Sequence, residues 1–201
     1  MLLQAEHLSI NFGSRQLLSD VNFYLNEGDK VGIIGINGTG KSTFLKVLAG
    51  AIEADEGRIV RNPNTQISFL SQNPAMEDNA TILEQIFLHF PKEFRELNEY
   101  EAKSMLTKLG FTDFSQKVGT LSGGQRNRVA LVAALVHHAD ILILDEPTNH
   151  LGSQMVAWLE DWLRAFRGGL IMVTHDRYFL ERVVNHITEL SRSKIYHFEA
   201  N

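Results

Sequence analysis

The sequence has no cysteine, which excludes disulfide bonds, a zinc site with cysteine ligands and a catalytic thiol. The first residues, MLLQAEHLSINF, lack the basic start and the uninterrupted apolar core of a secretory signal. No apolar run approaches the ~18 residues that a membrane-spanning helix needs. Together these absences predict a cytoplasmic protein with no direct insertion into a membrane.

Charge of one sign is not in large excess either, with 19 basic against 24 acidic residues and a net charge of -5. This balance gives no overall electrostatic attraction to nucleic acid, although a local basic patch stays compatible with it. At 201 residues, of which 44% are hydrophobic and 21% charged, the chain is long enough to bury the core of one substantial domain.

Three apolar segments rich in Val, Ile and Leu divide the sequence: VGII at 31–34, ILIL at 141–144 and LIMV at 170–173. Strands that are apolar on both faces are typical of parallel sheets with helices on each side. Patterns of helix length lie between them, at about residues 42–49, 123–137, 154–166 and 178–183. This alternation predicts an α/β fold.

Two parts of the chain depart from this alternation. Residues 1–30 and 57–70 alternate like half-buried strands, with a turn at Gly13 and Ser14, and predict an antiparallel subdomain. Residues 74–138 predict a helical subdomain, in which Pro91 and a charged turn separate two helical stretches. Near the C-terminal end, HITEL and KIYHF predict a hairpin.

The loop at residues 35–42, GINGTGKS, fits the pattern G-x-x-x-x-G-K-[ST] and lies between a predicted strand and a predicted helix, as that motif requires. Its glycines let backbone NH groups point inward and form a nest for phosphate oxygens at the positive end of the helix. Lys41 is expected to bridge the β- and γ-phosphates of a nucleotide, and Ser42 to occupy one position around Mg²⁺. The residues predicted to contact the nucleotide here are Gly35, Asn37, Gly38, Thr39, Gly40, Lys41, Ser42 and Thr43. The alternative is an ordinary glycine-rich turn, which the flanking strand and helix disfavour.

Asp145 and Glu146 follow the strand at 141–144, at the carboxyl edge of the predicted sheet, where α/β proteins bind ligands. Asp145 is expected to hold Mg²⁺ through its water shell, and Glu146 to polarise the water that attacks the γ-phosphate. Alone, such acids more often cap or solvate a loop. The phosphate loop upstream favours the catalytic interpretation.

The segment LSGGQ at 121–125, at the start of a predicted helix, resembles the signature of the ABC ATPases, and the resemblance runs from end to end. Ser122 is a good N-cap, and the glycines leave backbone NH groups bare at the positive end of the helix dipole. The resemblance implies a P-loop NTPase core of the RecA type, with ATP and Mg²⁺ as cofactors. It also implies that Ser122, Gly123, Gly124 and Gln125 bind the γ-phosphate of an ATP molecule held by a second ABC domain.

Three further residues match functional positions of the ABC family. The resemblance implies that Phe12 stacks on adenine, that Gln72 contacts Mg²⁺ and the attacking water, and that His175 hydrogen-bonds the γ-phosphate. Without the family context, these would be a core residue, an exposed loop residue and a structural histidine. The expected catalytic residues are Lys41, Gln72, Glu146 and His175, and the expected metal-binding residues are Ser42, Gln72 and Asp145.

The segments NHL after DEPT and THDRYFL are more similar to the class F branch of the family than to membrane transporters. Class F proteins carry two ABC domains on one polypeptide and act on the ribosome. The resemblance therefore implies the first ABC domain of a translation factor or antibiotic-resistance protein, although a homodimer is another source of the second domain. Two other functions stay open: the nucleotide-binding subunit of a membrane transporter, and an ATP-gated switch with little hydrolysis.

Gly152 departs from the family pattern, in which Asp usually follows NHL. Glycine removes a carboxylate from the seam between two domains and weakens the N-terminal support of the helix that starts near Gln154. We expect Ser153 to replace the missing cap, and communication between the two sites to suffer more than hydrolysis. The isolated domain is expected to bind nucleotide and to turn it over slowly.

Overall fold

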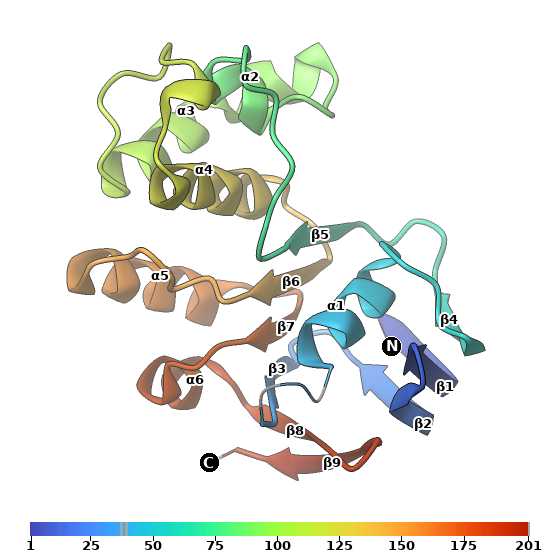
Figure 1. Ribbon diagram of the computed structural model, residues 1–201. Helices are drawn as coiled ribbons and strands as arrows, with labels where there is room; N and C mark the ends of the chain where they lie inside the picture. Colours follow the sequence, from blue (N-terminus) through green and yellow to red (C-terminus); the bar gives the residue numbers. More distant parts are fainter. Residues whose placement is uncertain (37, 39, 201) are drawn as a thin grey trace.

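The computed structural model describes residues 1–36, 38 and 40–200, and its strands form two sheets (Figure 1). The strands of the larger sheet are, in spatial order, β5 (Ile67–Leu70), β6 (Ile141–Asp145), β7 (Gly169–Val173), β3 (Lys30–Ile34), β8 (His186–Ser191) and β9 (Lys194–Glu199). All neighbouring pairs are parallel except β8 and β9, which form an antiparallel hairpin. The predicted α/β fold and the predicted C-terminal hairpin are both confirmed.

The central strands β6 and β7 are buried on both faces, which explains their continuous apolar sequences. In β6, Ile141 and Ile143 belong to one hydrophobic core, and Leu142 and Leu144 belong to the other. The first core is shared with α1 (Lys41–Ala49) and the smaller sheet. The second core is shared with α4 (Gly123–Val136), α5 (Ser153–Ala165) and α6 (Arg177–Val183).

The smaller sheet is antiparallel, and in it β1 (Leu3–Phe12) lies between β2 (Arg15–Leu25) and β4 (Glu56–Arg61). The segment that forms β5, which the prediction of an antiparallel subdomain included, pairs in parallel with β6, so the prediction is wrong there. As the edge strand of the larger sheet, β5 has side chains that are alternately buried and partly exposed. Its sequence alternates because the polar Ser68 interrupts it, and Ser68 is itself buried, with its Oγ donating to Ala134 O at 2.8 Å.

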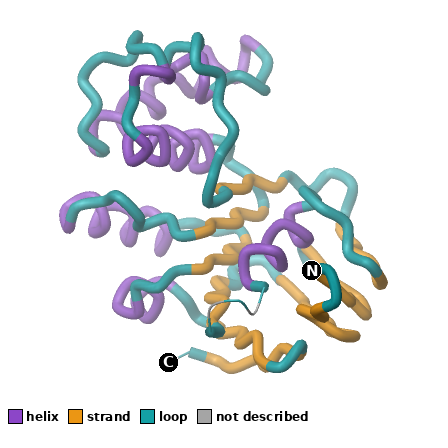
Figure 2. The backbone as a smooth tube through the Cα atoms, in the orientation of Figure 1, coloured by secondary structure: helices purple, strands orange, loops and turns teal. Residues whose placement is uncertain are grey.

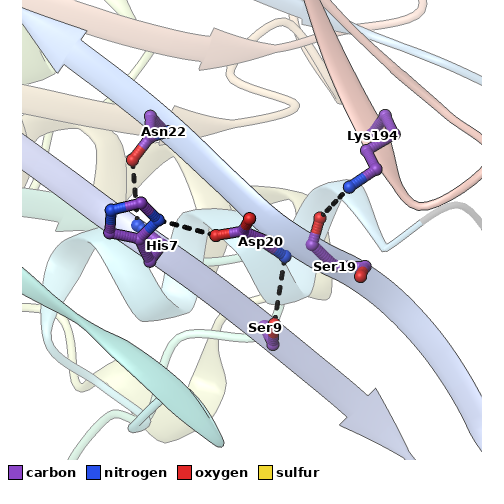
Figure 3. Close-up of polar contacts among 6 residues, drawn as sticks. All are labelled: His7, Ser9, Ser19, Asp20, Asn22 and Lys194. Atoms are coloured by element: carbon purple, nitrogen blue, oxygen red, sulfur yellow. Dashed lines mark hydrogen bonds and ion pairs between the residues drawn. The ribbon is translucent and has the colours of Figure 1, made fainter.

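The pairing of β1 with β2 is irregular at His7 and Asp20, which both have a left-handed backbone with φ of 50°. Side chains accept the backbone hydrogen bonds at this point. His7 N donates to Asn22 Oδ1 at 2.9 Å, and Asp20 N donates to Ser9 Oγ at 3.0 Å (Figure 3). The His7 ring Nδ1 also lies 2.7 Å from Asp20 Oδ1. Polar contacts from both strands therefore stabilise the irregular pairing.

Residues 74–138 form a lobe of helices and loops, in purple and teal at the top of Figure 2. Its helices are α2 (Ile82–Ile86), α3 (Lys92–Lys108), the 3-10 turn Val118–Thr120, and α4. The predicted charged turn is wrong, because α3 is continuous through that segment. Its charges form i,i+4 pairs instead, with Glu99 3.5 Å from Arg95 and 3.3 Å from Lys103. Among the described residues, no helix is both long enough and apolar enough to cross a membrane.

Candidate functional site

The glycine loop connects β3 to α1, as predicted. Two of its described positions have a backbone conformation that favours glycine. The backbone φ is 84° at Gly38 and 91° at Gly40, in the left-handed region. A side chain at Gly40 would lie 3.1 Å from Leu17 Cδ1, so the loop also approaches β2 closely. The Lys41 ammonium donates to the carbonyl of Gly35. Asn37 and Thr39, which were predicted to contact phosphate, lie outside the described residues.

A pocket of about 220 Å³ opens between this loop and the carboxyl ends of the parallel strands. It is lined by Gly38, Gly40, Lys41, Ser42, Thr43, Gln72, Glu146, Val173 and His175. A second pocket of about 290 Å³ shares Gln72 and Glu146 with the first and is also lined by Asp145. The fold therefore brings together the phosphate loop and all the predicted catalytic and metal-binding side chains.

Glu146 is buried and has a left-handed backbone, with φ of 53°. Its backbone N donates to Val173 O at 2.7 Å, which fixes the peptide beside β7. Its carboxylate contacts His175 twice: His175 N donates to Oε2 at 3.2 Å, and the ring Nε2 lies 3.2 Å from Oε1. A left-handed conformation is uncommon for glutamate, and strained residues of this kind concentrate at functional sites.

Asp145 is also buried, beside Ser42. Burial raises the pKa of Asp145, a hydrogen bond with Ser42 lowers it, and the charge of Glu146 raises it again. Asp145 Oδ1 is buried and has no hydrogen-bond partner within the described part of the chain. Mg²⁺ takes one or two oxygen ligands from a protein and completes its shell with phosphates and water. An orphaned carboxylate oxygen beside a hydroxyl fits that requirement.

The LSGGQ segment begins α4, and its Ser122 forms the predicted N-cap. Gln125 N donates to Ser122 Oγ at 3.2 Å, and Ser122 N donates to Gln125 Oε1 at 2.9 Å, which makes a capping box. A Cβ atom at Gly123 would meet no other atom within 4 Å. None of these residues lines the pocket at the phosphate loop.

Phe12 ends β1 and is 75% exposed, so it is not a core residue. Next to it, two residues that sequence reasoning missed contact the phosphate loop. A Cβ atom at Gly38 would have Arg15 of β2 as its nearest neighbour, and a Cβ atom at Gly40 would have Leu17 of β2. The pairing of β1 with β2 places these two residues beside the phosphate loop, and no sequence motif indicates that position.

The prediction that Ser153 caps α5 is wrong. Gly152 is the N-cap, and it makes no side-chain hydrogen bond to the helix. Ser153 is already the first helical residue, one position too late to accept from the NH groups of the first turn. The N-terminus of α5 therefore has no side-chain cap.

The family model described as ABC transporter matches residues 18–149, which is more than half of the chain. The chain belongs to the ABC transporter family. This ABC domain is 38% identical to the uncharacterized ABC transporter ATP-binding protein YfmR of Bacillus subtilis, with 100% of the chain and 38% of that protein covered. It is 36% identical to the ATP-binding protein Uup of Buchnera aphidicola, with 96% and 33% covered.

The ABC domain is also 33% identical to the energy-dependent translational throttle protein EttA of Escherichia coli K12, with 93% of the chain and 40% of that protein covered. EttA and Uup are class F proteins, in agreement with the class F resemblance. The chain spans two fifths or less of the length of these three relatives.

Solved structures share the fold at lower identity. An ATP-binding subunit of an ABC transporter matches with a TM-score of 0.88 and 23% identity, over 99% of this chain and 90% of that one. A dimeric ATP-binding cassette in a post-hydrolysis state with ADP and Pi matches with a TM-score of 0.82 and 23% identity, over 100% and 99%. These matches confirm the fold of a P-loop ATPase domain.

Proposed function

We propose that this domain binds MgATP and hydrolyses its β–γ bond, in a site that a second ABC domain completes. One observation carries the proposal: the phosphate loop, Gln72, Glu146 and His175 meet in one pocket at the carboxyl edge of the parallel sheet. Catalysis at a γ-phosphate depends mainly on positioning and on neutralising charge. The pocket supplies backbone donors, a cation and a carboxylate for this purpose.

The phosphate loop holds the triphosphate in this proposal. Its backbone NH groups and the N-terminus of α1 face the phosphate oxygens. Lys41 leaves the Gly35 carbonyl, which its ammonium contacts here, and bridges the β- and γ-phosphates. Phe12, which is exposed at the end of β1, stacks on the adenine.

The metal ligands and the base lie beside one another. Ser42, Asp145 and Gln72 hold Mg²⁺, which supplies charge neutralisation at the phosphates when it is bound. Glu146 accepts a proton from the attacking water, for which its carboxylate is held at the pocket wall. His175 touches that carboxylate at 3.2 Å and turns its ring to the γ-phosphate when ATP binds.

The second ABC domain supplies the SGGQ segment, residues 122–125, to this site. In the present chain that segment does not line the pocket at the phosphate loop, and the space around Gly123 is open. Two copies, or two domains of one polypeptide, would then enclose two ATP molecules. The dimeric cassette with ADP and Pi supports this arrangement.

We further propose a cytoplasmic class F protein with two ABC domains that acts on the ribosome, as a translation factor or antibiotic-resistance protein. The likeness to EttA, which is named a translational throttle, supports this role. The product of the full reading frame should co-sediment with ribosomes in the presence of ATP. Co-purification with membranes instead would favour the subunit of a transporter.

The test of the composite site is the ATPase rate per mole of protein at increasing protein concentration. The rate per mole should rise with concentration, because each site needs two domains. Glu146→Gln removes the base and should abolish the rise, whereas Glu96→Gln, an exposed glutamate on α3, should leave it unchanged. Full activity that is independent of concentration in a proven monomer contradicts the proposal.

A second function, an ATP-gated switch with little hydrolysis, is favoured by the two contacts through which His175 holds the Glu146 carboxylate. Oε2 accepts from the backbone N of His175, and Oε1 lies buried beside the His175 ring without a hydrogen bond to any described residue. A base held in this way is poorly exposed to water. Single-turnover phosphate release separates the two functions. A switch releases no more phosphate than its Glu146→Gln variant does, and a hydrolase releases a full equivalent.

A further inference from the structure

Arg15, the first residue of β2, is a cation that the site described above does not use. It pairs with Phe12 across the β1–β2 turn. A side chain at Gly38 would lie 3.4 Å from Nη1 and 3.7 Å from Nη2 of Arg15, so both ends of the guanidinium face the phosphate loop.

Neighbouring contacts hold this part of β2 in place. Leu17, two residues further along β2, lies against the loop at Gly40. Beyond it, Lys194, the first residue of β9, donates from Nζ to Ser19 O at 2.6 Å (Figure 3). Arg15 is thus carried by a segment fixed against both the loop and the larger sheet.

The guanidinium of Arg15 is exposed and forms no ion pair or hydrogen bond with any residue that the structure describes. By contrast, the Lys41 ammonium already contacts Gly35 O. A guanidinium presents parallel NH donors that match two oxygens of one phosphate group. The geometry beside Gly38 therefore suits a phosphate ligand that this chain does not itself provide.

We propose that Arg15 binds the α-phosphate of the nucleotide, an inference that rests on the proposed function. Arg15 is paired with Phe12, which is proposed to stack on the base, and lies beside the loop at Gly38, which is proposed to hold the phosphates. A cation between these two points reaches the phosphate next to the ribose. Such a contact is made equally with ATP and with ADP, so it contributes to binding and not to the chemical step.

The experiment measures the Kd of MgATP and of MgADP by isothermal titration calorimetry for the wild type, Arg15→Gln, Arg15→Lys and Arg58→Gln. Arg15→Gln should weaken both nucleotides by about tenfold, which corresponds to about 1.4 kcal/mol. Arg15→Lys keeps the charge and should lose less. Arg58→Gln, at an exposed arginine of β4 in the same sheet, should bind both nucleotides like the wild type.

The following results would overturn the inference. Unchanged affinity of Arg15→Gln for both nucleotides excludes the contact, and a loss with ATP alone would move the contact to the γ-phosphate. A Tm of Arg15→Gln several degrees below that of the wild type and of Arg58→Gln would mean that the variant acts through folding. If the wild type does not bind MgATP, the proposed function is overturned as well. If the wild type binds MgATP, Lys41→Ala loses this binding and Arg15→Gln keeps it, only the present inference is overturned.

Discussion

His175 contacts both oxygens of the Glu146 carboxylate, through its backbone N to Oε2 and its ring Nε2 to Oε1, each at 3.2 Å. The side chain of Glu146 is 6% exposed, whereas that of His175 is 67% exposed. The histidine is the solvent-facing member of the pair. Rotation of its ring away from Oε1 would expose the buried carboxylate to a water molecule in the pocket.

We expect Glu146→Gln to lower the rate of phosphate release by about a hundredfold or more, because the amide cannot take the proton of the attacking water. The amide oxygen still accepts from His175 N, so the Kd of MgATP should stay near that of the wild type. Quench-flow and calorimetry measure the two quantities. Equal loss in the exposed Glu96→Gln variant would show that the assay does not report on the base.

Asp145→Asn should raise Tm at pH 7.5. Burial raises the pKa of Asp145, so the folded state holds this proton more tightly than the unfolded chain does. The ionised carboxylate therefore destabilises the fold at neutral pH, and this cost disappears as the pH falls below the unfolded value of about 3.9. The gain in Tm should accordingly shrink as the pH is lowered.

The same variant tests the metal site. MgATP should raise the Tm of the wild type by more than that of Asp145→Asn, because the variant lacks the orphaned carboxylate oxygen. Asp161→Asn, at an exposed position of α5, serves as the matched control and should behave like the wild type. An Asp145→Asn domain that is less stable than the wild type at pH 7.5 and still responds fully to MgATP would refute this account of Asp145.

Ser122→Ala should destabilise the domain by about 1 kcal/mol through loss of its capping box. In a domain of this size that lowers Tm by about 2–4 °C. Thr81→Ala removes the equivalent capping box of α2 and should lower Tm similarly. Only Ser122→Ala should also reduce the ATPase activity that depends on protein concentration. Equal ATPase activity of the two variants would show that the SGGQ segment takes no part in the nucleotide site.

Gly152→Asp should stabilise the domain by about 0.5–1 kcal/mol, because it adds a cap to α5 and restricts the unfolded chain. A side chain at Gly152 meets nothing within 4 Å, and its φ of -74° suits any residue. Gly152→Ala isolates the effect on the unfolded chain. A thermal melt in which aspartate gives no more than alanine would show that the cap contributes nothing.

The sequence predicted the parts of the fold that repeat a local pattern. Buried strands such as β6 and β7 can be recognised in the sequence because both of their faces are apolar. The phosphate loop and the Ser122 cap can be recognised from residue type and spacing. The strand β5 was misplaced because the buried Ser68, which donates to Ala134 O, interrupts its apolar sequence. The continuous helix α3 was interrupted in the prediction because its charges lie on a solvated face.

The candidate site shows the same division. Motifs located Lys41, Asp145 and Glu146, and the sheet edge explains why they meet. The left-handed backbone of Glu146 and its contact with His175 depend on how β6 and β7 end side by side, which residue spacing does not reveal. Arg15 reaches the loop only through the pairing of two strands.

The affinity of Lys41→Ala for MgATP is the most direct test of the whole account, which assigns the triphosphate to the phosphate loop. Calorimetry should show binding weakened by at least about tenfold, the loss expected for one charge-assisted hydrogen bond. Lys103→Ala, at a lysine of α3, should bind like the wild type. An unchanged Kd for Lys41→Ala in the presence of magnesium would contradict the account.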